Sequence, residues 1–441
     1  MRLLVWIDKY RPVSTSRLAW FLFQYGLFFL PSSVFLAGLF LLPAFLFGSL
    51  KRQDSYWRDF WNYPFFCASV LMLIGCFTAY SGWLAWAGLA NWLPFFWIFW
   101  AAQPYLKTSA ARRRSAQWLM AGTVPVLVTG LGQIFLGWSG PWQLLNGLVI
   151  WFVDPGGQPN GRLSGLFDYA NITGAWLTLA WPFFLATLLQ PFLDRSHRIV
   201  AFILALTLCV ALVLTDSRNA WGGLILAIPF VLGPASWIWL VPLLILMMTP
   251  IAFAVLPGVD VELQQWARKL VPDSIWARLS DIKYLDRPLS STRLGQWKEA
   301  LNLVSSRPFF GWGAAAFSVL YPLRKGIWHG HAHNLPLEIA VSHGLPVSLL
   351  IVFGILGLLI VVFRRVMLAL NQKRSSIENA VFERAWWTAS FVMVVLHGSD
   401  LPFFDSRLNI AGWILLAGLR CMISSVNLDQ QGDSKIVFDV Q

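Results

Sequence analysis

The fold is decided by the run WIWLVPLLILMMTPIAFAVL, which covers Trp237–Leu256 and contains no charged residue. A helix of about 20 apolar residues crosses the hydrocarbon core of a membrane. Similar runs recur along the chain, which has 441 residues, of which 57% are apolar and only 12% charged. Soluble proteins have about 25% charged residues. The sequence therefore predicts an all-α polytopic membrane protein.

The apolar runs predict about twelve transmembrane helices, with a long periplasmic loop between the ninth and the tenth. Helices 1–5 fall in residues 1–136, helices 6–9 in 137–257 and helices 10–12 in 344–424. A break at Pro31–Ser33 divides the first run into two helices. Residues 258–343 form the loop, which we predict to be catalytic and to contain amphipathic helices. Residues 425–441 form a cytoplasmic tail.

The Lys and Arg residues set the orientation, because cytoplasmic loops of membrane proteins collect them. With the N-terminus in the cytoplasm, 20 of the 33 fall in or next to cytoplasmic segments and 10 in the long loop. Only Arg162, Arg218 and Arg407 remain in short outer loops. We therefore predict that both termini are cytoplasmic, and we attribute the net charge of +12 to topology rather than to nucleic-acid binding.

Four polar clusters fall on the predicted outer side. They are Asn160–Asn171, Thr215–Asn219, the long loop and Asp400–Arg407. Charged groups at a membrane edge are costly unless they are paired or hydrated, so they mark candidate sites. The arginine guanidinium donates paired hydrogen bonds to phosphate, and several arginines facing one crevice indicate a diphosphate or another polyanion. The alternative is that these arginines pair with neighbours or reach lipid phosphates.

The long loop contains a predicted amphipathic helix over Thr292–Ser305. Apolar residues recur at helical spacing, at Leu294, Trp297, Leu301 and Val304. This pattern is typical of a helix lying on a membrane. Arg293 stands in the first turn, where a positive charge is unfavourable for the helix dipole, so a ligand role is favoured. The glycines of Gly311–Gly313 predict a tight turn with close backbone approach.

Four of the six histidines lie in the long loop, at His329, His331, His333 and His343. Three interpretations stay open: a metal site, solvated or locally bonded groups, and a catalytic base. No acidic or cysteine partner near them completes an evident metal site, so we predict none. A histidine can take a proton from a hydroxyl near neutral pH. His333 is preferred because Asn334 follows it and a helix over Leu335–Val341 would hold it.

Several functional classes lack their motifs. The chain has no Gly-x-x-x-x-Gly-Lys-Ser/Thr phosphate loop, which argues against an ATP-driven pump, and no Gly-x-Ser-x-Gly nucleophile turn. It has no Asp-x-Asp for metal-bound nucleotide sugars. The four cysteines lie scattered in apolar runs without zinc or disulfide spacing. We predict no cofactor.

Four segments together resemble the O-antigen ligase and O-antigen polymerase superfamily. Thr215-Asp-Ser-Arg-Asn-Ala-Trp221 resembles its Ser-Arg-(Gly/Asn)-Ala-Trp segment, and Arg293–Gly313 resembles its Arg…Trp…Pro-Phe-x-Gly-x-Gly segment. His333-Asn334, followed by Gly344, resembles its His-Asn…Gly segment. Asn160–Asn171 is similar to its Arg-Leu-x-Gly…Asn segment. The resemblance covers residues 162–407.

The resemblance implies a metal-independent, inverting glycosyltransferase of the bacterial inner membrane. Its donor would be a glycan linked to undecaprenyl diphosphate, and its acceptor the lipid A-core or a growing glycan, among membrane lipids. Arg218 and Arg293 would bind the diphosphate and stabilise the leaving group, while His333 would activate the acceptor hydroxyl. The implied substrate-binding residues are Arg162, Asn171, Asn334, Arg407 and His331. The extra histidines leave the base open between His331 and His333.

The superfamily also supplies alternatives to an O-antigen ligase. Polymerases extend the glycan, some relatives glycosylate proteins, and a cyanobacterial branch has been linked to inorganic carbon accumulation. That branch suggests a bicarbonate-related transport protein as the second class. Transport predicts no need for His333, so the His333-Asn334 pair favours transfer. A non-catalytic scaffold would leave the outward arginines unexplained.

Overall fold

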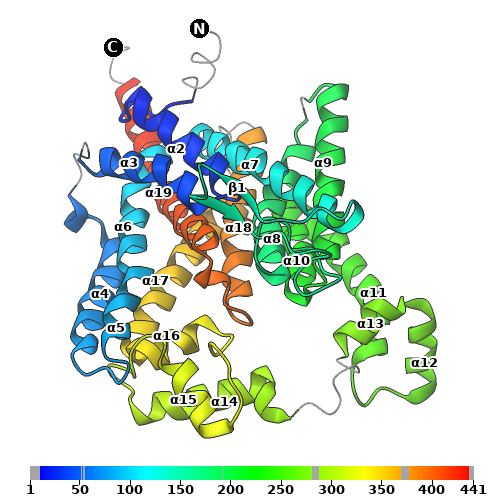
Figure 1. The fold of residues 1–441 in the computed structure, drawn as a ribbon. Coiled ribbons are helices and arrows are strands. Elements are labelled where there is room, and N and C mark those ends of the chain that lie inside the picture. Colours follow the sequence, from blue (N-terminus) through cyan, green and yellow to red (C-terminus); the bar gives the residue numbers. More distant parts are fainter. Residues whose placement is uncertain are drawn as a thin grey trace.

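The structure is a computed structural model that describes residues 10–50, 52, 55–191, 193–280, 288–368 and 377–436, without the side chains of residues 274, 278, 377–378 and 424–436. These residues form a bundle of helices, so the predicted all-α class is confirmed (Figure 1). One small hairpin interrupts it, in which β1 (Trp142–Leu144) pairs antiparallel with β2 (Val149–Trp151). The hairpin lies in the connection between two long helices.

The helices follow the predicted apolar runs closely. The first ten are α2 (Arg17–Phe29), α3 (Val34–Leu50), α4 (Tyr63–Cys76), α5 (Trp83–Gly88), α6 (Leu93–Ala101), α7 (Ser109–Phe135), α8 (Ala170–Leu188), α9 (Arg195–Leu214), α10 (Arg218–Leu232) and α11 (Trp237–Val255). The remaining ones are α12 (Val261–Leu270), α13 (Asp273–Leu279), α14 (Arg293–Ser306), α15 (Ala316–Lys325), α16 (Leu335–His343), α17 (Leu345–Phe363), α18 (Ile377–Leu396) and α19 (Ser406–Ile436). Short 3₁₀ turns lie at Tyr56–Arg58, Phe60–Asn62, Leu89–Asn91, Gln103–Tyr105, Pro234–Ser236, Leu289–Ser291 and Pro402–Phe404, and a π-helical segment at Arg364–Leu368 extends α17.

Polar side chains begin many of these helices. The capping residues are Ser16, Thr108, Asp194, Asp260, Thr292 and Asn334. Each accepts a hydrogen bond from a backbone N–H of the first turn, which has no partner inside the helix. Two of these caps start the helices of the candidate site. Thr292 places Arg293 at the first position of α14, and Asn334 starts α16 directly after His333.

Six helices in the described ranges are long and apolar enough to cross a membrane. They are Trp83–Tyr105, Ser109–Phe135, Arg195–Leu214, Pro234–Val255, Leu345–Leu368 and Ser406–Ile423. Shorter apolar helices cover Val34–Leu50, Phe60–Cys76 and Arg218–Leu232. The chain therefore has the helices of a multi-pass membrane protein, whereas the count of about twelve spans stays a prediction.

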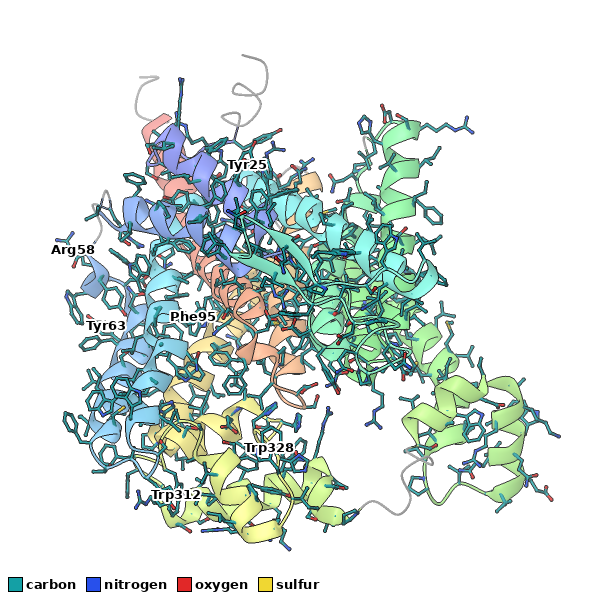
Figure 2. The ribbon with its side chains drawn as sticks, viewed as in Figure 1. Tyr25, Arg58, Tyr63, Phe95, Trp312 and Trp328 are labelled. Atoms are coloured by element: carbon teal, nitrogen blue, oxygen red, sulfur yellow. The ribbon has the colours of Figure 1, made fainter. Side chains whose placement is uncertain are left out.

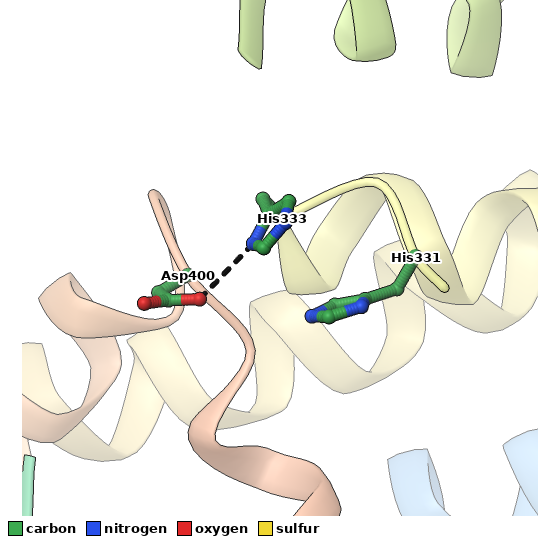
Figure 3. A group of neighbouring side chains, drawn as sticks. All are labelled: His331, His333 and Asp400. Atoms are coloured by element: carbon green, nitrogen blue, oxygen red, sulfur yellow. Dashed lines mark hydrogen bonds and ion pairs between the residues drawn. The ribbon is translucent and has the colours of Figure 1, made fainter. Parts of the chain in front are cut away.

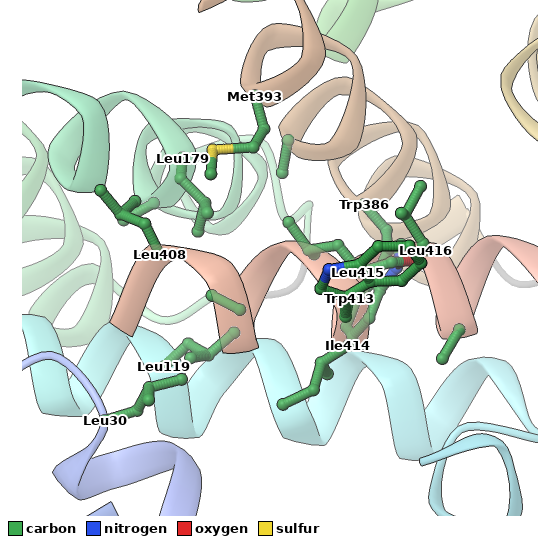
Figure 4. Packing of buried hydrophobic residues seen from close by; sticks show 14 of the residues in the cluster. Leu30, Leu119, Leu179, Trp386, Met393, Leu408, Trp413, Ile414, Leu415 and Leu416 are labelled. Atoms are coloured by element: carbon green, nitrogen blue, oxygen red, sulfur yellow. Dashed lines mark hydrogen bonds between the residues drawn. The ribbon is translucent and has the colours of Figure 1, made fainter. Parts of the chain in front are cut away.

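Helix α19 is the central element of the bundle. Its apolar segment Ser406–Ile423 is 72% buried, and its side chains pack among residues of several other helices (Figure 4). Trp386 of α18 donates its indole N–H to the carbonyl of Leu415 at 2.9 Å. This packing fixes the turn between α18 and α19, which contributes an aspartate to the candidate site.

The segment Gly311–Gly313 packs against α16, and it also contacts the turn between α4 and α5, where the backbone N–H of Ser81 donates to the carbonyl of Trp312 at 3.2 Å. Gly311 and Gly313 have φ values of 67° and 98°, and a side chain at Gly311 would lie 2.6 Å from the carbonyl oxygen of Val341. The backbone N–H of Trp312 donates to that carbonyl at 2.8 Å. The predicted tight turn is therefore confirmed. Figure 2 shows Trp312 and Trp328 at the lower end of the molecule, opposite Tyr25.

The predicted helix over Thr292–Ser305 is confirmed as α14, but its buried face differs from the predicted stripe. Leu294 and Leu301 are 67% and 54% exposed, whereas Ala300 and Leu303 are fully buried against α15 and α16. The reason is that α14 packs on protein through the face that carries Ala300, Leu303 and Val304. Its outward leucines remain available to a membrane surface, and that contact stays a prediction.

Helices α14–α16 of the long loop lie on the opposite side of the molecule from the first described helix and the C-terminal end of the last one (Figure 1). Helix α2 and the C-terminal end of α19 are at the top of Figure 1, and α14–α16 are at the bottom, beneath α4, α5 and α17. Helices α12 and α13 stand apart at the lower right. This arrangement agrees with a loop and termini on different faces, and the assignment of those faces to periplasm and cytoplasm stays a prediction.

Candidate functional site

Asp400, in the turn between α18 and α19, is the centre of a polar cluster. Its Oδ1 lies 3.1 Å from Nδ1 of His333, as Figure 3 shows. Its Oδ2 accepts a hydrogen bond from the amide of Asn171 at 3.3 Å and lies 3.7 Å from Nη2 of Arg293. One carboxylate thus joins residues from three separate parts of the chain.

Arg162 connects this cluster to the remaining predicted polar segment, Thr215–Asn219. Its Nη2 donates to Oδ1 of Asn171 at 2.5 Å, and its Nε donates to the backbone carbonyl of Thr215 at 2.8 Å. A small crevice is lined by Asn171 and Asp400 together with Ser217 and Asn219, the residues on either side of Arg218. The structure therefore brings all four polar clusters together at one place.

His333 is held by the backbone around it. It has a φ of 50°, a left-handed conformation that is uncommon outside glycine. The next residue, Asn334, caps α16 by accepting from the N–H of Leu337, and its amide donates to the carbonyl of Gly398 at 2.9 Å. The oxygen of the Asn334 amide therefore caps α16, and its nitrogen ties the start of α16 to the end of α18. We assign Asn334 to positioning, because these bonds set His333 against Asp400.

The charges around Asp400 favour its ionised form. Burial alone would raise its pKa, but the hydrogen bond and charge of His333 and the charge of Arg293 together hold the pKa below its usual value. An ionised carboxylate only accepts hydrogen bonds. In the neutral form of His333, Nδ1 therefore carries the hydrogen and Nε2 has a lone pair. This is the arrangement of an oriented general base.

His331 lies beside His333 and differs from it in its partners. The two ring centroids are 4.3 Å apart. Burial and then the neighbouring His333 lower the pKa of His331 to about 4, so it is neutral at physiological pH. Its ring has no aspartate at bonding distance among the described residues. Of the two candidates for the base, only His333 has a carboxylate partner.

The structure corrects one sequence expectation about a metal. His331, His333 and Asp400 offer potential ligand atoms within 4.8 Å of one another, so the acidic partner that the sequence did not reveal is Asp400. Both oxygens of Asp400 already accept from His333 and Asn171, and Arg293 lies where a cation would bind. The contacts favour a histidine–aspartate pair supported by arginine, and metal independence stays a prediction.

Arg407 does not join this cluster. Its guanidinium forms a two-pronged ion pair with Asp405, donates to the carbonyl of Leu166 at 2.8 Å, and stacks 3.8 Å from the ring centroid of Phe167. It is only 8% exposed. These contacts use most of its donors inside the protein and indicate a structural role.

Sequence reasoning missed Asp400 as a site residue, although it began one of the four clusters. The available signal was that Asp400 directly follows an apolar run and falls on the same predicted outer side of the membrane as His333. The missing information was the distance in space, because 67 residues separate the two along the chain.

Comparison with protein families supports the resemblance that the sequence motifs show. Residues 200–352 match the family described as O-antigen ligase. The matched part includes Arg218, Arg293 and His333, whereas Asp400 and Arg162 lie outside it. Among curated proteins, none matches the chain. The match over residues 200–352 supports membership of this chain in the O-antigen ligase superfamily, which its motifs predict.

Proposed function

We propose that the chain transfers a glycan from undecaprenyl diphosphate to an acceptor hydroxyl at the periplasmic face of the inner membrane, in an O-antigen ligase-like reaction. The family implies a glycosyltransferase-like enzyme with lipid-linked glycan substrates. The observation that carries the proposal is the Asp400 cluster, which joins a histidine base to two arginines within one network.

His333 is the general base in this reaction. Nε2 takes the proton of the acceptor hydroxyl as the hydroxyl oxygen attacks the anomeric carbon of the donor sugar. A new glycosidic bond forms, and the bond between the anomeric carbon and the diphosphate oxygen breaks. Asp400 stabilises the imidazolium that results. Direct displacement of this kind inverts the anomeric centre.

The arginines bind the leaving group. The diphosphate departs with the electron pair of the broken bond, and the guanidinium groups of Arg293, Arg162 and Arg218 stabilise this charge. Arg293 is suited to this role because its side chain is 35% exposed and its distance to Asp400 exceeds that of a hydrogen bond. These cations take the place that a metal ion has in other glycosyltransferases, so we expect no metal requirement.

The test compares two charge removals on the same helix. Arg293→Ala removes a cation near Asp400, whereas Lys298→Ala removes an exposed cation five residues further along α14. Each variant is expressed in a bacterium that lacks its own ligase, and glycan on lipopolysaccharide is read on a gel at matched membrane levels. We expect Arg293→Ala and His333→Ala to lower transfer at least about 100-fold, the usual cost of losing one charge-stabilising group, with Lys298→Ala close to wild type.

Further outcomes of this assay separate the alternatives. Long free glycan chains without capped lipopolysaccharide would indicate the polymerase reaction instead of ligation. Transfer in isolated membranes should be unchanged by EDTA. Activity that survives both His333→Ala and Arg293→Ala would contradict the site, and activity lost in EDTA and restored by a divalent metal would contradict metal independence.

A further inference from the structure

A cavity of about 410 Å³ opens beside His331. It lies between α5 and α16, beneath the turn that follows α18. Its main lining side chains are Trp92, His331, Glu338, His343, Phe403 and Phe404. The volume is within the range of about 300 to 1,000 Å³ that small-molecule sites occupy.

The cavity lining suits a neutral, hydroxyl-rich ligand. Trp92 and Phe403 stack at 4.3 Å between ring centroids, and Phe404 meets His331 edge-on at 5.6 Å. Such flat apolar walls match the C–H faces of a sugar ring, and a few polar groups fix its orientation. No Lys or Arg is among the described lining residues. The diphosphate is therefore expected on the arginine side and not here.

His343 is the polar group of the lining that most needs a ligand. It is only 4% exposed, and among the described residues its side chain has a ring contact with Trp92 but no hydrogen bond. Burial lowers the pKa of His343 to about 4, so the imidazole is neutral, with one nitrogen donating and one accepting. A buried imidazole without partners is costly, and a ligand hydroxyl in the cavity would satisfy it.

Glu338 connects the cavity to the base. Its Oε2 accepts from the backbone N–H of Ala332 at 2.9 Å, and Ala332 lies between His331 and His333. Burial raises the pKa of Glu338 to about 7, so its carboxyl is largely protonated at slightly acid pH and donates a hydrogen bond then. A ligand that contacts Glu338 therefore lies beside the backbone that carries both histidines.

We propose that this cavity is the acceptor subsite and takes a neutral sugar residue whose attacking hydroxyl points past His331 towards His333. The inference rests on the proposed function. An inverting displacement needs the acceptor and the leaving group on opposite sides of the anomeric carbon. The cavity is lined by His331 and not by Asp400, the residue that Arg293 approaches, so the acceptor and the leaving group are assigned to separate places in the site.

The test places a large side chain in the cavity by a substitution at an exposed lining residue. Ala87 lines the cavity, and Ala90, three residues further along, does not, while both are exposed. Full-length wild type, Ala87→Trp and Ala90→Trp are purified in detergent and mixed with the methyl glycosides of glucose, galactose, heptose and N-acetylglucosamine. Binding is read by saturation-transfer NMR without any donor. We expect at least one glycoside to bind wild type and Ala90→Trp, with a signal at least fivefold weaker in Ala87→Trp.

Two results would overturn the inference. One is that none of the four glycosides binds wild type, and the other is that Ala87→Trp binds as wild type does. Because no donor is present, these results do not depend on the diphosphate chemistry. Loss of the proposed function would instead appear as normal transfer by Arg293→Ala, which leaves glycoside binding unaffected. The two failures are therefore distinguishable.

Discussion

Asp400 and Asp405 lie five residues apart between α18 and α19, and each faces an arginine in a different way. Asp405 and Arg407 form short bonds of 2.5 to 3.1 Å, with side chains only 14% and 10% exposed. Asp400 and Arg293 are 3.7 Å apart, with side chains 17% and 35% exposed. The first pair is closed and satisfied, whereas the second is open and shares its aspartate with His333 and Asn171.

This contrast separates an arginine that is bound within the protein from one that we propose to bind the substrate. Arg407 has already used its fork on Asp405 and on a backbone carbonyl, so a substrate phosphate would have to break those bonds. Arg293 lies 3.7 Å from its aspartate, beyond hydrogen-bond distance, and its side chain is 35% exposed. Both arginines lie on the predicted outer side, so charge and topology do not distinguish them. Their partners do.

The largest effect is expected when the two aspartates are neutralised one at a time. Asp400→Asn removes the acceptor that holds the hydrogen on Nδ1 of His333, and we expect transfer to fall about 1,000-fold or more, as when an oriented base loses its carboxylate. Asp405→Asn touches no proposed catalytic group, and its transfer per folded protein should stay within about threefold of wild type. Initial rates in membrane vesicles at matched protein level measure both. Equal losses would break the contrast between the two aspartates.

The fold was largely predictable because membrane helices can be recognised in a sequence by their length and apolar composition. The break at Pro31–Ser33 separates α2 from α3, and the run Trp237–Leu256 corresponds to α11 almost residue for residue. The hairpin β1–β2 was not predicted, because three-residue strands produce no alternation long enough to recognise. The buried face of α14 also differed, since it is set by the contacts with α15 and α16 and not by the spacing of its own largest apolar side chains.

The site was predictable as far as local motifs reach. Arg162, Asn171, Arg293 and His333 were all proposed from sequence, and the structure connects them. Asp400 was not, because it lies in a separate turn and acts only through contacts across the bundle. Arg407 was predicted to bind substrate because its ion pair with Asp405 and its bond to the carbonyl of Leu166 cannot be read from the sequence.

A smaller effect concerns stability at the closed pair. Arg407→Ala leaves the buried Asp405 carboxylate without its partner, so we expect a loss of about 3 kcal/mol in the free energy of unfolding. Arg293→Ala should cost less than about 1 kcal/mol, because its pairing is loose and partly exposed. Thermal unfolding of both variants in the same detergent measures the difference. Arg407→Lys should recover only part of the loss, because lysine lacks the planar fork. Equal melting temperatures for Arg407→Ala and Arg293→Ala would contradict the structural role.

The smallest expected effect is the pH dependence of stability that His331 causes beside the Asp400–His333 pair. His331 faces His333, His329 and Asp400, and burial holds its pKa near 4, compared with about 6.5 in an unfolded chain. Between these values the unfolded chain binds a proton at His331 and the folded chain does not. The stability that neutral His331 contributes is therefore complete above pH 6.5 and is lost progressively as the pH falls towards 4.

The variant His331→Asn lacks this titration and isolates it from the other buried groups. We expect the difference in melting temperature between wild type and His331→Asn to shrink steadily from pH 6.5 to pH 4. No histidine is among the contacts of Arg407 within the described ranges, so the Arg407→Ala variant should keep the same shrinkage when His331→Asn is added to it. A difference that stays constant with pH would mean that the pKa of His331 is about 6.5 in the folded protein as in the unfolded chain, so that His331 becomes charged at acid pH. The cavity wall beside His333 would then be cationic, which would weaken its match to a neutral sugar.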